Sequence, residues 1–263
     1  MNQANLEPEV NLEAKASNIS KANLDRRDFL AKSSIGLAGL AIAPGMLLFD
    51  LAHGRAPGEA VSNKVRWGML IDNNECESGC NDCVTACNTE HGLATPTKPT
   101  DSQWIRKVQL KDTFTGRVSS LPMMCQHCEE PPCVDVCPTQ ASFKRADGIV
   151  LVDQHLCIGC RYCVMACPYQ ARSFVHEVLT DQKTETPRGK GIVESCNLCV
   201  NRIDKGDNTT ACAEACSKAG HNAILFGDLN DPQSEIAKRI RTVSSTQIRA
   251  DLGLNTGVRY EGI

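Results

Sequence analysis

The sequence is poor in aromatic residues, in long apolar runs and in blocks of basic charge. Only 4% of its 263 residues are Phe, Trp or Tyr, so the side chains that fill most protein cores are scarce. The net charge is −3 and no Lys/Arg block is present, which argues against nucleic acid as a partner. After about residue 56, no segment approaches the roughly 18 apolar residues of a membrane span.

Common catalytic and cofactor motifs are missing as well. We find no G-x-G-x-x-G, no phosphate-binding loop and no Ser-His-Asp set. No CxxC pair is followed by His, which excludes the attachment motif of c-type haem. We therefore expect no catalytic site in this chain, and no chemistry on a substrate.

Cysteine, by contrast, is abundant: all 16 cysteines lie between residues 76 and 216 in four groups of four. Every group ends in C-x3-C, and the third, followed by Pro168, is the iron–sulfur run C-x2-C-x2-C-x3-C-P. In two-cluster ferredoxins such a run gives three thiolates to one cluster and the fourth to its neighbour. Sixteen thiolates in this pattern predict four 4Fe-4S clusters. The groups are Cys76, Cys80, Cys83, Cys87; Cys125, Cys128, Cys133, Cys137; Cys157, Cys160, Cys163, Cys167; and Cys196, Cys199, Cys212, Cys216.

Two other uses of cysteine stay open as alternatives. Structural zinc takes four ligands per ion in two separated pairs, which does not account for quartets ending in C-x3-C-P. Disulfides are normal in exported proteins, but four evenly built quartets make a poor disulfide framework. The rival interpretation is thus a binding module held by zinc or disulfides, and a third is an enzyme in its own right.

The N-terminus carries a second signal. Arg26 and Arg27 are followed by Phe29 and Leu30 and then by a weakly apolar stretch rich in Gly and Ala, which resembles a twin-arginine export signal. Cluster binding is coupled to folding, so a cluster protein gains from export in the folded state. We expect residues 1–56 to be this signal, cleaved or retained, and the protein to be periplasmic.

Between the cysteine groups, apolar patterns predict short strands and one helix. Asp147-Gly148 between two apolar segments is a strong hairpin signal. The predicted strands are 65–72, 104–110, 117–123, 141–145, 149–153 and 223–227; the helix is 234–241; loops are 95–101 and 181–190; and 252–263 is an extended tail without core periodicity.

The four quartets, the N-terminal segment and GDLNDPQSE at 227–235 resemble the four-cluster iron–sulfur subunits that accompany molybdopterin oxidoreductases and polysulfide-reductase-type membrane proteins. WGMLIDNNECESGC, CIGCRYCVMACPYQARSFVHE and the ending GVRYEGI are most similar to the periplasmic iron–sulfur subunit, subunit O, of the Dsr electron-transport complex associated with dissimilatory sulfite reductase. The electron-transfer subunits of tetrathionate, polysulfide and dimethyl sulfoxide reductases share the same cysteine plan.

The resemblance implies an α+β fold of tandem ferredoxin-like type, with two pseudo-duplicated modules of two 4Fe-4S clusters each and a loop-rich cluster-binding core. The four-cluster domain would span 57–263. Groups one and four would form one module, groups two and three, about 121–176, the inserted second module, and 228–263 a C-terminal tail.

The resemblance also implies which cysteines share a cluster, because groups one and four, and groups two and three, exchange their last cysteines. One departure from the family is the extra residue between Cys76 and Cys80, where Gly79 would let the loop bulge. The implied sets are Cys76, Cys80, Cys83, Cys216; Cys196, Cys199, Cys212, Cys87; Cys125, Cys128, Cys133, Cys167; and Cys157, Cys160, Cys163, Cys137.

The implied function is electron transfer without a catalytic site. The chain would relay electrons between a quinone-interacting polytopic membrane subunit and other redox subunits of a sulfur-metabolism complex. A multihaem cytochrome c subunit and further membrane or cytoplasmic redox subunits are expected partners. In relatives, the cluster held mainly by the third group lies nearest the membrane subunit.

A few other residues are candidates for tuning the clusters. His127 and His155 are close in sequence to cysteine groups and could donate hydrogen bonds, and Arg161 beside Cys160 could raise a cluster's reduction potential. The alternatives are packed or exposed histidines and a solvated arginine. The remaining histidines lack ligand spacing; these include His91, His176 and His221.

Overall fold

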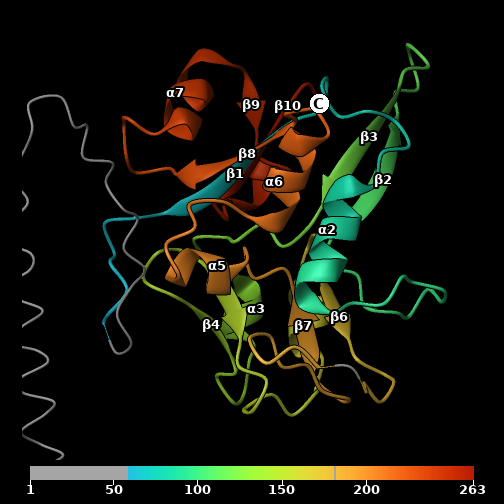
Figure 1. Cartoon of the computed structure of the whole chain (residues 1–263), viewed down its shortest axis with the longest axis vertical. Coiled ribbons are helices and arrows are strands. Elements are labelled where there is room, and N and C mark those ends of the chain that lie inside the picture. Colours follow the sequence, from blue (N-terminus) through green and yellow to red (C-terminus); the bar gives the residue numbers. More distant parts are fainter. Residues whose placement is uncertain (1–58, 181) are drawn as a thin grey trace, which may run out of the picture. The chain divides into compact units, whose positions relative to one another are not determined.

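The computed structural model describes residues 59–180 and 182–263. The predicted export segment, with Arg26, Arg27, Phe29 and Leu30, lies outside the described residues. Within them, short strands and small helices surround the cysteine loops (Figure 1), in agreement with an α+β, loop-rich core. In the described part of the chain, no helix has the length and apolar character needed to cross a membrane.

A four-stranded sheet in the order β8-β1-β10-β9 forms one side of the core. Strand β1 (Trp67–Asp72) leads into the first cysteine group, and β8 (Ile224–Asp228) pairs with it antiparallel, both as predicted. Met69 and Ile71 of β1 are fully buried, which fits an apolar strand in the middle of a sheet. The edge strand β9 (Ser245–Thr246) is short.

The C-terminus contributes a strand to the interior of this sheet. Strand β10 (Val258–Glu261) lies between β1 and β9 and is parallel to β1. Val258 and Tyr260 are fully buried, and the Tyr260 hydroxyl accepts a hydrogen bond from Gln126 Nε2 at 3.0 Å. The prediction of a tail without core periodicity was therefore wrong. A strand of four residues shows too few alternations for its period to stand out in the sequence.

Two helices carry cysteines of groups one and four and pack against each other (Figure 1). Helix α2 (Asp82–His91) contains Cys83 and Cys87, which lie on one face because they are four residues apart. Helix α6 (Ala211–Lys218) contains Cys212 and Cys216 at the same spacing. The packing of α2 on α6 brings together two cysteine groups that are far apart in the sequence.

Between these helices the chain forms three two-stranded hairpins. The pairs β2 (Arg106–Lys111) with β3 (Val118–Met123) and β4 (Ser142–Lys144) with β5 (Val150–Val152) confirm the two predicted hairpins. Strand β6 (Arg172–Phe174) pairs with β7 (Val193–Ser195) across a long loop that the sequence patterns did not link.

The remaining helices are short, apart from one near the C-terminus. Helices α3 (Pro132–Asp135) and α4 (Tyr162–Ala166) lie in groups two and three and contact each other, and α5 (Val200–Asp204) follows Cys199. Helix α7 (Glu235–Thr242) confirms the predicted helix and begins after Ser234, whose hydroxyl accepts from Ala237 N at 3.2 Å. A single 3-10 turn, η1 (Ala250–Leu252), precedes β10.

Candidate metal centres

All sixteen cysteines are free thiols, and most of them are removed from solvent. Cys160 alone among them is exposed, and five others are half-buried. Buried structural cysteines are ordinarily inert, and the gathering of this number of them around a few loops calls for a function that packing does not supply. The half-buried ones are Cys76, Cys80, Cys137, Cys157 and Cys167.

Two of the expected ligand sets line separate cavities of equal size. Each cavity has a volume of about 300 Å³, and each combines three cysteines of one group with the last cysteine of another. The first is lined by Cys76, Cys80, Cys83 and Cys216, and the second by Cys125, Cys128, Cys133 and Cys167.

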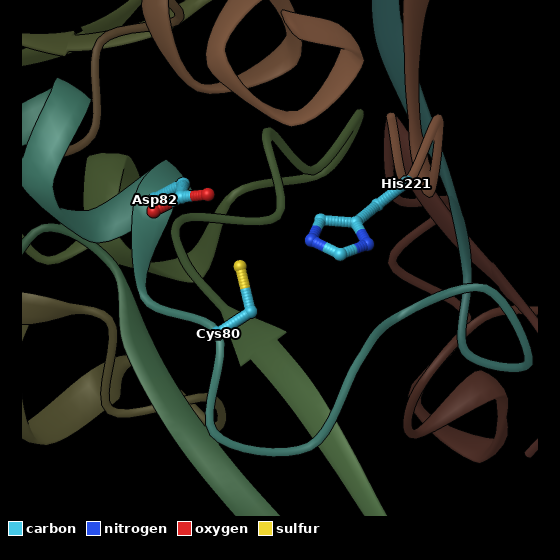
Figure 2. Close-up of side chains that lie close together, drawn as sticks. All are labelled: Cys80, Asp82 and His221. Atoms are coloured by element: carbon cyan, nitrogen blue, oxygen red, sulfur yellow. The ribbon is translucent and has the colours of Figure 1, made fainter. Parts of the chain in front are cut away.

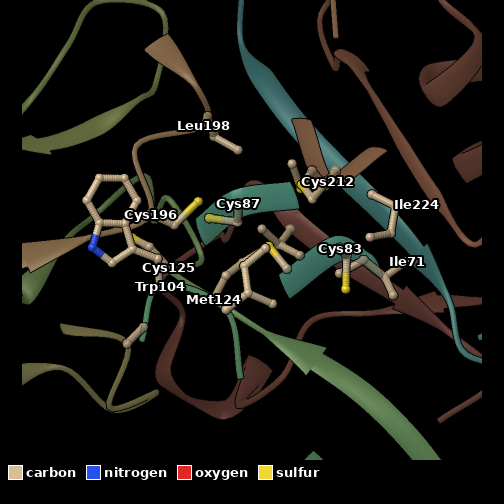
Figure 3. Close-up of a cluster of buried hydrophobic side chains, with 14 of the residues drawn as sticks. Ile71, Cys83, Cys87, Trp104, Met124, Cys125, Cys196, Leu198, Cys212 and Ile224 are labelled. Carbon is tan, nitrogen blue, oxygen red and sulfur yellow. The ribbon is translucent and has the colours of Figure 1, made fainter. Parts of the chain in front are cut away.

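The thiols of a third expected set face one another in the core between α2 and the loop before α5. Figure 3 shows the Cys87 and Cys196 sulfurs pointing toward one another, with Cys212 close by. Burial raises the pKa of the Cys87 thiol well above its usual range, and the neighbouring Cys196, Cys212 and Cys199 raise it further. Like-charge repulsion of this kind means that all four sulfurs lie within electrostatic reach.

The fourth expected set is the most exposed. Cys157 Sγ accepts a hydrogen bond from Val193 N at 3.4 Å, and Cys137 Sγ accepts one from Ser142 N at 3.3 Å. Cys163 is buried, and it packs in a small apolar cluster that also includes Cys133 of the neighbouring set. Backbone donors to sulfur are typical of iron–sulfur sites, whose potentials they help to set.

The spacing of the sulfurs argues against zinc. Ligands on one zinc ion lie about 2.3 Å from the metal, so any two of them are at most about 4.6 Å apart. Within residues 59–180 and 182–263, only one group of three or more potential ligands has all its atoms within 4.8 Å of one another, and it holds a single cysteine. The cysteine quartets are therefore too wide for one ion, whereas a multi-atom cluster fits the cavities that they line.

Electrostatics also favour a positively charged occupant. Burial, followed by repulsion from neighbouring thiols, raises the pKa of Cys83, Cys125 and Cys128 to about 12. Burial likewise raises the pKa of Cys212 to about 12. Thiols held this way stay protonated at pH 7 unless a metal compensates for the thiolate charge. The donor set thus fits iron–sulfur clusters, which bind thiolates and supply that compensation.

The one close group is Cys80, Asp82 and His221, at the rim of the first cavity (Figure 2). His221 Nε2 also lies 3.4 Å from Glu77 Oε2. The sequence pattern gave no role to His221, because it follows Cys80 by well over a hundred residues. Since Cys80 belongs to the first cysteine set, the trio is part of that site and not an independent one.

His91 is another residue that sequence reasoning missed. Its Nε2 lies 3.5 Å from Cys199 Sγ and its Nδ1 lies 3.4 Å from Thr186 Oγ1, while the ring packs on Trp104 with centroids 4.4 Å apart. Burial lowers the pKa of His91 to about 4, so the imidazole is neutral at pH 7. It offers the third set a polar contact without a full charge.

The residues that the sequence did single out for tuning lie elsewhere. His127 is buried, and its Nδ1 accepts a hydrogen bond from Val150 N at 3.0 Å, so it helps to fix β5. His155 is exposed. Arg161 is also exposed and lies over the Phe174 ring at 4.8 Å from its centroid. Their effect on the clusters stays a prediction.

Two basic residues that the sequence motifs did not mark lie directly against the cysteine sets. Lys107 Nζ lies 2.9 Å from Cys76 Sγ. Arg172 lines the second cavity and contacts Ser142. No local signal marks Lys107, which is 31 residues from Cys76. Arg172 stands five residues after Cys167, and the same position after Cys137 is Ser142, so a comparison of the two groups would have found it.

Comparison with known proteins gives a consistent family. Residues 117–228 match the model of a 4Fe-4S dicluster domain. The Hdr-like menaquinol oxidoreductase iron–sulfur subunit 1 of Archaeoglobus fulgidus is 39% identical, over 90% of this chain and 97% of its own length. A subunit of the tetrathionate reductase of Salmonella typhimurium is 38% identical, over 82% and 79%. A subunit of the sulfite dehydrogenase of Allochromatium vinosum is 38% identical, over 73% and 81%.

Proposed function

The chain belongs to the 4Fe-4S dicluster family of iron–sulfur subunits and binds several 4Fe-4S clusters, and on this premise we propose that it is an electron-transfer subunit with four of them. Bound clusters supply one-electron carriers, and the protein supplies the thiolates, the surrounding charges and the exclusion of water. The observation that carries the proposal is the pair of matched cavities, each lined by three cysteines of one group and one of another.

The proposed ligand sets are those that the family resemblance implies. The two cavities support the first and third of these sets, and the mutual repulsion of Cys87 with Cys196, Cys199 and Cys212 supports the second. The fourth set, Cys137 with Cys157, Cys160 and Cys163, follows from the exchange of last cysteines between groups two and three. We propose no catalytic role for any residue, so the chemistry on substrate belongs to a partner.

We propose a quinone-interacting membrane subunit as one partner, docked at the third cysteine group. Four apolar side chains around the exposed Cys160 support this placement, since each exposes between 54% and 74% of its surface. Exposed apolar patches mark interaction sites, and a partner covering this one would approach the fourth set closely. The four side chains are Leu156, Ile158, Tyr162 and Met165.

The narrower proposal is the periplasmic subunit of a sulfur-metabolism complex of the Dsr type, with a multihaem cytochrome c subunit among its partners. The motifs of the first and third groups and the ending GVRYEGI support it, together with the twin-arginine segment. The electron-transfer subunit of a tetrathionate, polysulfide or dimethyl sulfoxide type reductase is the second candidate, because relatives of that kind align with most of the chain.

Metal analysis of anaerobically purified protein tests the central proposal. We expect about sixteen iron atoms and about sixteen acid-labile sulfides per chain, with the brown colour of 4Fe-4S proteins. About twelve iron atoms would mean that one set is incomplete. Colourless protein containing zinc, or protein whose cysteines are paired in disulfides, would overturn the proposal in favour of a binding module. Co-purification with membrane subunits then identifies the complex.

A further inference from the structure

Arg172 and Ser142 occupy equivalent positions in the two middle cysteine groups. Each lies five residues after the last cysteine of its group, at the end of the sequence C-P-x-Q-A, and each begins a short strand. The turns have the same backbone form, because Gln140 has φ 57° and Gln170 has φ 50°. The two positions meet: Arg172 Nη1 donates a hydrogen bond to Ser142 Oγ at 2.5 Å.

The environment of Arg172 is unusual for an arginine. Its relative exposure is 5%, and both Nε and Nη2 are buried without a hydrogen-bond partner among the described residues. No carboxylate in the described part of the chain forms an ion pair with it. Other buried arginines here do have partners: Arg188 pairs with Glu194, and Arg145 with Asp147. An unpaired buried charge is costly, so Arg172 requires a negative group that the side chains other than cysteine do not supply.

The nearest candidates are the sulfurs of both inner ligand sets. Burial works to lower the pKa of Arg172, but the thiolates of Cys133, Cys125 and Cys163 outweigh it and raise the pKa above its ordinary value. Cys125 and Cys133 belong to the cavity that Arg172 itself lines, whereas Cys163 belongs to the adjacent fourth set. One guanidinium is therefore within electrostatic reach of two proposed cluster sites.

We propose that Arg172 is a counter-ion shared by the two inner cluster sites, held between them by Ser142, and that its charge raises the reduction potentials of both. This inference rests on the proposed function, since it requires clusters in those sets. A nearby cation stabilises the reduced, more negative state of a cluster, and in a buried setting the effect is little screened. A shared cation also lessens the repulsion between two adjacent reduced sites.

The test compares Arg172→Gln, which removes the charge, with Arg172→Lys, which keeps it. Both variants of the full chain are purified anaerobically, assayed for iron and sulfide, and titrated with redox mediators while paramagnetic resonance follows each cluster. In Arg172→Gln we expect two of the clusters to become at least tenfold harder to reduce, about 59 mV for a one-electron couple, while the other two keep their potentials. Arg172→Lys should recover most of the shift.

A matched control is Arg161→Gln. Arg161 is an exposed arginine of the same region, stacked on Phe174, so we expect its removal to leave all potentials nearly unchanged. Unchanged potentials in an iron-replete Arg172→Gln protein would overturn the inference.

Loss of iron from the Gln variant is also informative. If Arg172→Lys keeps its iron while Arg172→Gln loses the inner clusters, the positive charge is what these sites need, which supports the inference. If both variants lose iron equally, the shape of the side chain matters and the counter-ion role is refuted. Wild-type protein without clusters would instead refute the proposed function itself, so the two failures are distinguishable.

Discussion

Lys107 Nζ donates a hydrogen bond of 2.9 Å to Cys76 Sγ. Lys107 lies on β2 and is half-buried against the cavity of the first cysteine set. Charge-assisted bonds of this kind are shorter and stronger than neutral ones. With a cluster in place, the ammonium would stabilise the reduced state, so the first set receives a positive charge from the hairpin as the inner sets do from Arg172.

Replacing Lys107 with Gln should therefore lower the reduction potential of one cluster only. We expect a shift of about tenfold in its reduction equilibrium, about 59 mV, because the site is only partly screened by solvent. A redox titration followed by paramagnetic resonance measures the shift. Lys111→Gln is the matched control, since Lys111 ends the same strand and is exposed. Equal shifts in both variants would mean that net charge, and not the contact with Cys76, matters.

The exchange of cysteines between groups predicts which variants share a phenotype. Cys76→Ser and Cys216→Ser should alter the same resonance signal, because both residues line the first cavity. Cys87→Ser should alter a different signal, although Cys87 and Cys76 belong to the same group in the sequence. Iron content and resonance spectra of the three variants provide the measurement. A signal common to Cys76→Ser and Cys87→Ser, and absent from Cys216→Ser, would contradict the exchange.

Cys160 is the ligand through which the membrane-facing end can be tested. Relatives with Trp at this position hold a three-iron cluster, so Cys160→Trp or Cys160→Ser should convert one cluster and raise its potential. We expect quinone-linked electron transfer to fall strongly while three clusters stay intact. Resonance spectra verify the conversion, and quinol oxidation in membranes reports the function. Normal quinone-linked transfer in a converted variant would place the membrane partner at another cluster.

The ion pair between Arg188 and Glu194 predicts a stability effect independent of the metal sites. Arg188 Nη2 lies 2.7 Å from Glu194 Oε1, both side chains are buried, and Arg188 Nη1 donates to Gly92 O at the end of α2. Arg188→Met leaves the Glu194 charge buried and unpaired, so we expect the free energy of unfolding to fall by about 3–5 kcal/mol.

Anaerobic denaturation by urea, followed by loss of cluster absorbance, measures that change. A double variant with Arg188→Met and Glu194→Leu serves as the control, because it leaves neither charge unpaired and should recover much of the lost stability. If the double variant is no more stable than the single one, the effect comes from lost packing.

Export provides a last prediction, from the proposed twin-arginine segment. Replacing Arg26 and Arg27 with Lys should leave folded, brown protein in the cytoplasm, because clusters are inserted as the chain folds and before transport. Cell fractionation with an iron assay of each compartment measures the outcome. Periplasmic delivery at the wild-type level would show that another signal directs export.

The sequence by itself determined the features that depend on a few neighbouring residues. The C-x2-C and C-x3-C spacings predict cluster ligands because each loop must present its sulfurs from a short stretch of chain. Asp147-Gly148 fixed the hairpin of β4 and β5 because the turn requires a positive φ, and Gly148 has φ 85°. Ser234 likewise marked the start of α7 by capping it.

Only the tertiary structure decided the contacts between distant segments. Lys107 reaches Cys76 across 31 residues and His91 reaches Cys199 across 108, and no local pattern encodes either approach. Strand β10 enters the middle of the sheet because its two buried residues find a place beside β1, although its own pattern is too short to predict a strand. Arg172 gained its role in the same way. Its charge acquires meaning only where the fold closes two cysteine groups around it and leaves thiolates as its counter-charges.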